Sequence, residues 1–273
     1  MSKIIIYIPS KERSESLRTL VSIPQYRLPS VRVVVHDSEY AKYSESLGSD
    51  MVVATPAVGI ANVRQWVLEN AENEYPLFMD DDMDFGWRDE EGKIHKAGTE
   101  EVEGMLLLLE SWLEEGFVHV GVSQRAGNNR CEEAFTEISR MNNIYAYNAK
   151  KALAAGGRFD RLQVMEDFDM TLTLLRAGLP NRVTFNYCWG QQKSGAAGGC
   201  STYRTFEVQR EAAFRLSQLH PGLVRVAGKR SKTEWEGIGG SRVDVQIAWK
   251  KAYNPKRQAT SGGIHKFFGA AVK

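Results

Sequence analysis

Short apolar segments that alternate with amphipathic helical segments constrain the fold of this chain more than any other feature. The predicted strands are continuous apolar runs, typical of a sheet buried on both faces, at residues 3–9, 31–36, 50–54, 75–79, 118–122 and 144–147. Helical periodicity is found at residues 59–72, 100–115 and 168–177, and a further helix ends at residues 156–157. This alternation predicts an α/β fold with a mixed, mostly parallel sheet flanked by helices. In such folds functional side chains gather at the carboxyl ends of the strands.

The composition narrows the classes of protein that this chain can represent. Its 273 residues are 42% hydrophobic and 25% charged, which excludes a disordered, collagen-like or disulfide-scaffold chain. No apolar run approaches the roughly 20 residues that span a bilayer, and no signal-peptide cleavage site follows the N-terminus. The three cysteines contain no CxxC pair, which argues for a reducing compartment and against a structural zinc site. We therefore expect a cytoplasmic protein with no membrane partner.

The strongest chemical signal is PLFMDDDMDF at residues 76–85, where an apolar strand runs directly into four aspartates within five positions. Adjacent carboxylates repel one another and lose hydration when they are partly buried. A hard divalent cation such as Mg²⁺ or Mn²⁺ offsets that cost, because it prefers oxygen ligands and keeps positions open for substrate phosphates. The motif therefore predicts metal and phosphate binding, and the alternative is an acidic turn without a ligand.

Polar residues also follow two other predicted strands. SKER at 10–13 follows the strand at 3–9, and Asp37 follows the strand at 31–36. This ordered set, with the helix GIANVRQWVLENA and then FMDDD, resembles the nucleotide-binding half of GT-A-fold glycosyltransferases. The resemblance implies that Asp80 contacts the ribose and that Asp82, together with Asp80, holds the Mn²⁺ or Mg²⁺ that bridges the donor diphosphate. It places Asp37 at the nucleobase. The other donor-binding residues that it implies are Pro9, Lys11, Arg13, Asn62, Arg64 and Asp81.

A second motif lies in LQVMEDFDMTLTLLRAG at residues 162–178. It resembles the Glu-Asp motif of the same family, in which a carboxylate at a helix N-terminus deprotonates the acceptor hydroxyl. The resemblance implies that Asp167 is the general base, that Glu166 orients the acceptor or the base, and that the enzyme is inverting. The alternative is that these carboxylates only stabilise the positive end of the helix dipole.

The segment WGQQKSGAAGGCSTYR at 189–204 is predicted to be a loop. Its glycines, with Lys193 and Arg204, suit a lid that closes on a diphosphate, and a simple glycine-rich turn is the alternative. The family often supplies a third metal ligand from this region, frequently a histidine. No histidine lies between His119 and His220, so that ligand has no assignment.

Charge is divided unevenly along the chain. Residues 220–273 carry 11 Lys and Arg against 3 Asp and Glu, whereas residues 1–219 carry 24 against 31. We therefore expect a catalytic domain at 1–205 and a basic helical or extended region at 206–273. Cations interleaved with aromatic side chains suit a nucleic-acid surface, although a solvated basic face would have the same composition. The predicted DNA-binding residues are Lys229, Arg230, Lys232, Trp235, Lys250 and Lys251.

Small enzymes with an acidic body and a basic tail resemble the bacteriophage glycosyltransferases that modify hydroxymethylated pyrimidines in DNA, including the TET-associated type. This resemblance implies hexosyl or pentosyl transfer from a UDP-sugar to DNA in the cytoplasm of an infected host. A glycan or small-molecule acceptor is the first alternative. A GT-A-type nucleotidyltransferase, which normally has a glycine-rich loop after the first strand, and a non-catalytic nucleic-acid-binding module are the others. The chain contains neither GxGxxG nor GxxxxGK[ST], which counts against a Rossmann dehydrogenase and a P-loop enzyme.

Overall fold

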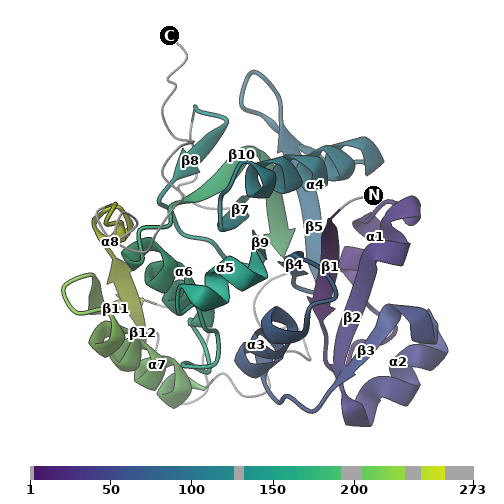
Figure 1. Cartoon of the computed structure of the whole chain (residues 1–273), viewed down its shortest axis with the longest axis horizontal. Coiled ribbons are helices and arrows are strands. Elements are labelled where there is room, and N and C mark those ends of the chain that lie inside the picture. The colour runs from purple at the N-terminus through teal and green to yellow at the C-terminus, as the bar shows by residue number, and fades with distance from the viewer. Residues whose placement is uncertain (1–2, 126–131, 192–204, 231–240, 256–273) are drawn as a thin grey trace.

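The computed structural model describes residues 3–125, 132–191, 205–230 and 241–255. Its main feature is a ten-stranded sheet in the order β3-β2-β1-β4-β9-β7-β10-β5-β6, with β8 paired to β10 (Figure 1). The strands are β1 (Ile4–Pro9), β2 (Val31–His36), β3 (Val52–Thr55), β4 (Tyr75–Met79), β5 (Met83–Arg88), β6 (Ile94–Lys96), β7 (His119–Gln124), β8 (Phe135–Glu137), β9 (Ile144–Tyr147) and β10 (Asn181–Gln191). Strands β5, β8 and β9 run against the direction of the other seven. The predicted mixed, mostly parallel sheet is thus confirmed.

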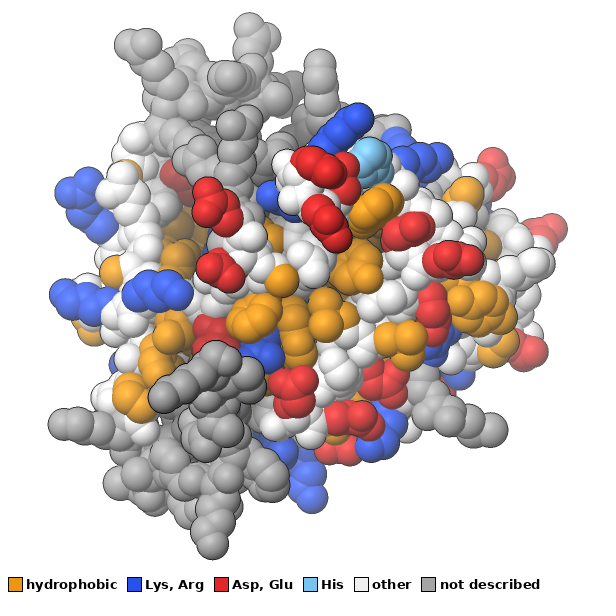
Figure 2. Space-filling view, turned by 90° about the horizontal axis from the view of Figure 1, so that it is seen from above, with side chains coloured by type: hydrophobic (Ala, Val, Ile, Leu, Met, Phe, Trp, Pro, Cys, Tyr) orange, Lys and Arg blue, Asp and Glu red, His pale blue; other side chains and the backbone are white. Residues whose placement is uncertain are grey.

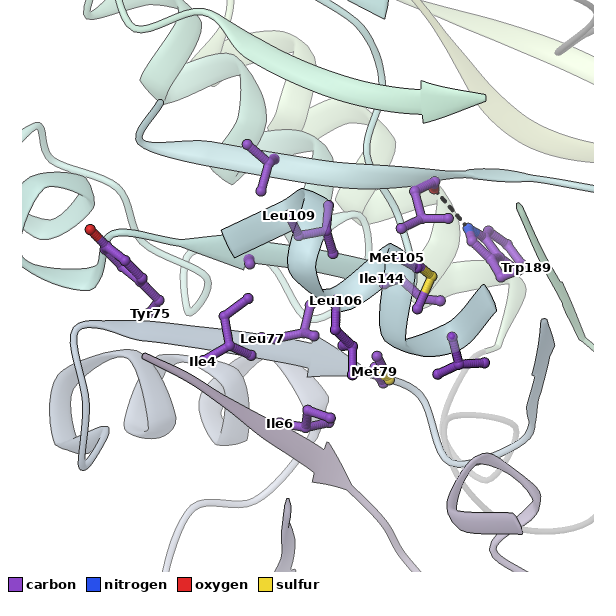
Figure 3. Packing of buried hydrophobic residues seen from close by; sticks show 14 of the residues in the cluster. Ile4, Ile6, Tyr75, Leu77, Met79, Met105, Leu106, Leu109, Ile144 and Trp189 are labelled. Atoms are coloured by element: carbon purple, nitrogen blue, oxygen red, sulfur yellow. Dashed lines mark hydrogen bonds between the residues drawn. The ribbon is translucent and has the colours of Figure 1, made fainter. Parts of the chain in front are cut away.

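Helices cover both faces of this sheet. The longer ones are α2 (Tyr40–Leu47), α3 (Ile60–Asn70), α4 (Thr99–Glu114), α6 (Glu166–Arg176) and α7 (Phe206–Leu219), and the shorter ones are α1 (Arg18–Ser22) and α5 (Ala149–Ala154). Helices α3, α5 and α6 pack on one face against a cluster that includes Phe78 and Tyr145. Helix α4 packs on the other face, where Met105, Leu106 and Leu109 meet side chains of β1, β4 and β9 (Figure 3). The central strands are therefore buried on both faces, as their unbroken apolar sequences require.

The structure corrects the prediction for the start of the 189–204 segment. Trp189 lies in β10 rather than in a loop, and its side chain is only 1% exposed. Its indole Nε1 donates a hydrogen bond to the carbonyl of Val122 over 3.1 Å (Figure 3). Residues 192–204 lie outside the described residues. Strand β10 was not predicted because Asn186, Gly190 and Gln191 interrupt its apolar pattern, and its register with β7 shifts between Thr184 and Cys188.

The C-terminal elements pack against the outer side of α6. They are α7, the hairpin of β11 (Val224–Arg230) and β12 (Ser241–Ile247), and α8 (Trp249–Ala252). Leu172 and Leu175 of α6 share an apolar cluster with Ala213 and Leu216 of α7. These elements lie at the opposite end of the molecule from β2, β3 and α2 (Figure 1). The boundary between residues 1–205 and 206–273 stays a prediction. In the described part of the chain, no helix is long and apolar enough to cross a membrane.

Candidate functional site

Three aspartates form the turn between β4 and β5, where β4 ends beside β1. The loop that follows β1 reaches them directly. Arg13 Nη1 lies 2.5 Å from Asp81 Oδ1 and 3.3 Å from Asp82 Oδ2. Ser10 Oγ donates to Asp81 Oδ2 over 2.7 Å. Two neighbouring parallel strands therefore bring their terminal polar residues together, as expected for this sheet edge.

Arg64 of α3 joins this turn to the start of α6. Its Nη2 donates to Asp80 Oδ1 over 2.6 Å, and its Nη1 donates to Glu166 Oε1. The Arg64 side chain is 6% exposed, so both ion pairs are largely shielded from water. The two acidic motifs that the sequence singled out, about 80 residues apart, thus share one guanidinium. We call Asp80, Asp81, Asp82, Glu166 and Asp167 the acidic centre.

Burial and mutual repulsion perturb the ionisation of the acidic centre. Burial raises the pKa of Asp80 to about 6, and the neighbouring carboxylates oppose the lowering effect of Arg64. The pKa of Glu166 is raised to about 7 for the same reasons. Burial also raises the pKa of Asp81 in spite of Arg13. Perturbed carboxylates of this kind are concentrated at functional sites.

The backbone is unusual where α6 begins. Met165, immediately before the helix, has φ 64°, a left-handed conformation that bulky residues rarely adopt. It places Glu166 toward the buried Arg64, whereas Asp167 is partly exposed. One Asp167 oxygen accepts a hydrogen bond from the Phe168 amide over 2.9 Å. The first turn of α6 therefore presents one carboxylate to the interior and the next toward accessible space.

Three residues in contact with the aspartates were missed by the sequence analysis. Asn143 Nδ2 donates to Asp80 Oδ2 over 2.6 Å, and Gln191 Nε2 donates to Asp82 Oδ1 over 2.7 Å. Thr19 Oγ1 donates to the Asp80 carbonyl over 2.5 Å. Asn143 also has a left-handed φ of 64°. A signal for it exists, because it directly precedes β9, whose antiparallel pairing with β4 places its start beside the aspartates.

The other residues predicted to bind the sugar-nucleotide donor make no hydrogen bond to Asp80, Asp81 or Asp82 among the described contacts. Pro9 ends β1, and Lys11 is exposed, 3.6 Å from Glu12. Asp37 is exposed at the end of β2. Asn62 is exposed and donates to the Val58 carbonyl over 2.8 Å. Their roles in donor binding stay predictions. Lys193 and Arg204 lie outside the described residues.

The residues present fit a divalent cation by charge. Among the described side chains, four of the five carboxylates of the acidic centre, Asp80, Asp81, Asp82 and Glu166, form ion pairs with only two arginines, Arg13 and Arg64. Asp80 and Asp82 supply the oxygen chemistry that Mg²⁺ and Mn²⁺ prefer, and such a cation would neutralise the excess negative charge. Within the described ranges, no three His, Cys, Asp or Glu side chains form a complete ligand set. Asp80 and Asp82 as metal ligands therefore stay a prediction.

The basic residues predicted to contact DNA are only partly described. Lys250 and Lys251 are exposed on α8, and the Lys250 ammonium donates to the carbonyl of Glu137. Lys229 and Arg230 have backbones in β11, but their side chains lie outside the description, as do Lys232 and Trp235 altogether. On the face seen in Figure 2, described acidic and basic side chains are interspersed around a hydrophobic band.

The chain is similar to several known proteins. The chain is 22% identical over 236 residues to the beta-glucosyl-HMC-alpha-glucosyl-transferase of Enterobacteria phage T6, covering 80% of this chain and 81% of the relative. Similar solved structures include Staphylococcus aureus TarS 1–349 with UDP-GlcNAc (TM-score 0.48, 17% identity, 80% and 67% covered). Another is the glucosyl-3-phosphoglycerate synthase of Mycobacterium tuberculosis with Mn²⁺, UDP and phosphoglyceric acid (TM-score 0.48, 12% identity, 88% and 89% covered).

The family model for TET-associated glycosyltransferases matches residues 4–199. That range contains the whole sheet and both acidic motifs that Arg64 joins. The chain therefore belongs to the TET-associated glycosyltransferase family.

Proposed function

We propose that this glycosyltransferase moves a sugar from a UDP-sugar to the hydroxyl of a hydroxymethylated pyrimidine in DNA. The observation that carries the proposal is the ion-pair chain from Asp80 through Arg64 to Glu166. It holds the motif assigned to the donor beside the helix start assigned to the acceptor. The name of the phage T6 relative, a glucosyl-HMC glucosyl-transferase, supports the acceptor. An infected host's cytoplasm is the setting that this acceptor implies.

In this proposal the donor lies between the loop after β1 and the aspartate turn. Asp80 contacts the ribose, and Asp82 with Asp80 holds a divalent cation. When bound, that cation supplies positive charge to the donor diphosphate. Arg64 and Asn143 orient Asp80 from two sides, since each donates to a different oxygen of its carboxylate. Arg13 and Gln191 do the same for Asp82.

Asp167 is the proposed general base. It removes the proton of the acceptor hydroxyl as the hydroxyl oxygen attacks the anomeric carbon, and the nucleoside diphosphate leaves with the bonding electrons. Attack opposite the leaving group inverts the anomeric centre. Glu166, held by Arg64, positions the turn that carries Asp167 and has a carboxylate less accessible to the acceptor. A positioned base contributes roughly 10²–10⁴ in rate.

Two assays test this function. The first measures thermal shifts with a panel of sugar nucleotides, with and without Mn²⁺, because a ligand that binds only the folded state raises the melting temperature. We expect the largest metal-dependent shift with a UDP-sugar. The second follows labelled sugar into hydroxymethylated DNA, matched unmodified DNA and free glycans at two salt concentrations. We expect label only in the hydroxymethylated DNA, and less at the higher salt. Transfer to a glycan but to neither DNA would contradict the acceptor assignment.

A further inference from the structure

A hollow of about 390 Å³ is lined by residues of α1, β5 and β6 and by Arg125, which follows β7. Its lining is formed by Arg18, Asp84, Ile94, His95, Lys96 and Arg125. Asp84 is the fourth aspartate of the motif at 76–85 and takes no part in the contacts of the acidic centre described above. The hollow therefore contains the part of that motif which the proposed chemistry leaves unused.

Two glycines leave room for the guanidinium of Arg125 in this hollow. A Cβ on Gly190 would lie 2.5 Å from Asp84 Oδ1 and 3.2 Å from Arg125 Nη1. A Cβ on Gly86 would lie 3.1 Å from Arg125 Nη2 and 2.8 Å from the His95 carbonyl. The Arg125 backbone is anchored as well, since its amide donates to the Trp189 carbonyl over 2.8 Å. The arginine thus lies against backbone that no side chain obstructs.

The charges in the hollow are arranged to receive an anion. Asp84 Oδ1 lies 2.8 Å from Arg125 Nη2, and Asp84 Oδ2 lies 3.7 Å from Arg18 Nη2. One carboxylate therefore faces two guanidiniums, and the exposed ammonium of Lys96 adds a third cation. The lining has an excess of positive charge even with Asp84 ionised. Arginine forks and lysine ammonium groups together match the tetrahedral oxygens of a phosphate group.

The position of the hollow decides which phosphate it would meet. Asp84 follows Asp82 by two residues, and its strand partner Gly190 precedes Gln191, which donates to Asp82. The hollow is thus next to the aspartate turn, on the side of β5 and β6. The loop after β1 is assigned to the nucleotide, and its Ser10 and Arg13 contact Asp81. Helix α1, which follows this loop, supplies Arg18 to the lining of the hollow. The hollow contains Asp84, whereas the loop after β1 contacts Asp81 and Asp82, so an anion in the hollow would lie beside the part of the motif that is not assigned to the nucleotide.

We propose that Arg18, Lys96 and Arg125 bind a phosphodiester group of the acceptor DNA strand close to the base that receives the sugar. This inference rests on the proposed function, because it takes DNA as the acceptor. It assigns a phosphate contact to the catalytic domain itself, separate from the C-terminal lysines. Such a contact positions the strand but reads no base, so it acts equally on modified and unmodified DNA.

The test compares Arg125→Ala and Lys96→Ala with Lys93→Ala, which removes an exposed lysine between β5 and β6 that is not part of the lining. Fluorescence anisotropy measures the affinity of the full chain for labelled hydroxymethylated and unmodified duplexes over a salt series. We expect each lining variant to weaken the binding of both duplexes about threefold and to reduce the salt slope by at most about 0.9, the value for the single phosphate that the three cations share. Lys93→Ala should match the unaltered protein.

The outcomes separate this inference from the proposed function. If the lining variants bind DNA like Lys93→Ala while the unaltered protein binds it well, the inference is wrong and the DNA acceptor stands. If they lose the thermal shift with UDP-sugar but keep DNA affinity, the hollow holds the donor phosphates and the inference is wrong. Absence of DNA binding by the unaltered protein at low salt would overturn both. Lys96→Ala changes only an exposed side chain and keeps the test valid should Arg125→Ala fold poorly.

Discussion

The acidic centre and the C-terminal basic region hold their charges in opposite ways. In the acidic centre, Asp80 and Glu166 share the buried Arg64, and their pKa values are raised. On the C-terminal elements, Arg225 and Lys251 are exposed. Salt screens buried charges only slightly, and each buried charge depends on a fixed partner. Exposed charges each contribute little, and salt reduces the distance over which they attract a ligand. The first arrangement suits chemistry at a defined atom, and the second suits attraction to a polyanion.

Among the substitutions that test this comparison, we expect the largest effect, a loss of turnover, at Asp167. Asp167→Asn keeps the shape of the side chain but cannot accept the proton, so turnover should fall by roughly 10²–10⁴. Donor affinity, measured by thermal shift, should be retained. Asp50→Asn, which neutralises an exposed aspartate at another surface, serves as the control and should leave turnover unchanged. A fall of less than tenfold would mean that another group is the base.

Replacement of Arg64 measures how much the buried ion pairs of the acidic centre contribute to the free energy of unfolding. Arg64→Met leaves Asp80 and Glu166 without their shared cation, and we expect the free energy of unfolding to fall by about 3–5 kcal/mol. Arg32→Met removes an ion pair with Glu72, whose side chain is 50% exposed, and should cost less than about 1 kcal/mol. Urea unfolding measures both. Equal losses in the two variants would contradict the distinction between buried and exposed charge.

His119 provides a pH-dependent measure of the same burial. Burial lowers its pKa to about 4, below the ordinary value of 6.5, although its hydrogen bond to the Leu179 carbonyl opposes the shift. Between these values the unfolded chain binds more protons, so this histidine lowers stability as pH falls from 6.5 toward 4. Glu166 and Asp80 act in the opposite direction, because their folded pKa values are raised.

The histidine contribution is isolated by His119→Gln, whose amide can still donate to Leu179. From pH 7.5 to pH 5 we expect the unaltered protein to lose about 2 kcal/mol of unfolding free energy relative to this variant. Chemical denaturation at each pH measures the difference. A constant difference across the range would show that the pKa of His119 is the same in the folded and unfolded states, which would contradict the effect of burial.

The smallest effects are expected in the basic region. The double variant Lys250→Ala, Lys251→Ala should bind DNA more weakly and with a smaller salt slope. For each phosphate that is no longer neutralised, we expect affinity to fall about threefold and the slope to fall by about 0.9. Lys42→Ala with Lys150→Ala, which removes exposed lysines from α2 and α5, is the matched control. Anisotropy over a salt series measures both pairs. An identical slope in the two double variants would remove the lysines of α8 from the DNA surface.

Sequence reasoning succeeded where local pattern determines structure. The apolar run at 75–79 ends in aspartates, and parallel neighbours bring the loop with Arg13 beside them. It failed where contacts depend on long-range register. Asn143 and Gln191 reach the aspartates through antiparallel pairing and through β10, whose interrupted pattern concealed a strand. Charge counts predicted that the C-terminal segment is basic, but they cannot say which of its side chains face a common surface.

In the proposed function, the acidic centre binds the donor and the C-terminal basic region binds DNA. The most direct test measures UDP-sugar binding and DNA affinity on one variant of each region. Asp82→Ala should abolish the Mn²⁺-dependent thermal shift with UDP-sugar and leave DNA affinity within about twofold of the unaltered protein, because a single partly buried carboxylate contributes little to polyanion attraction. The Lys250→Ala, Lys251→Ala variant should do the reverse, with an intact donor shift and weaker, less salt-dependent DNA binding. If Asp82→Ala keeps the metal-dependent shift, or if the lysine variant loses the donor shift while it retains DNA affinity, the assignment of donor and acceptor to these two regions is wrong.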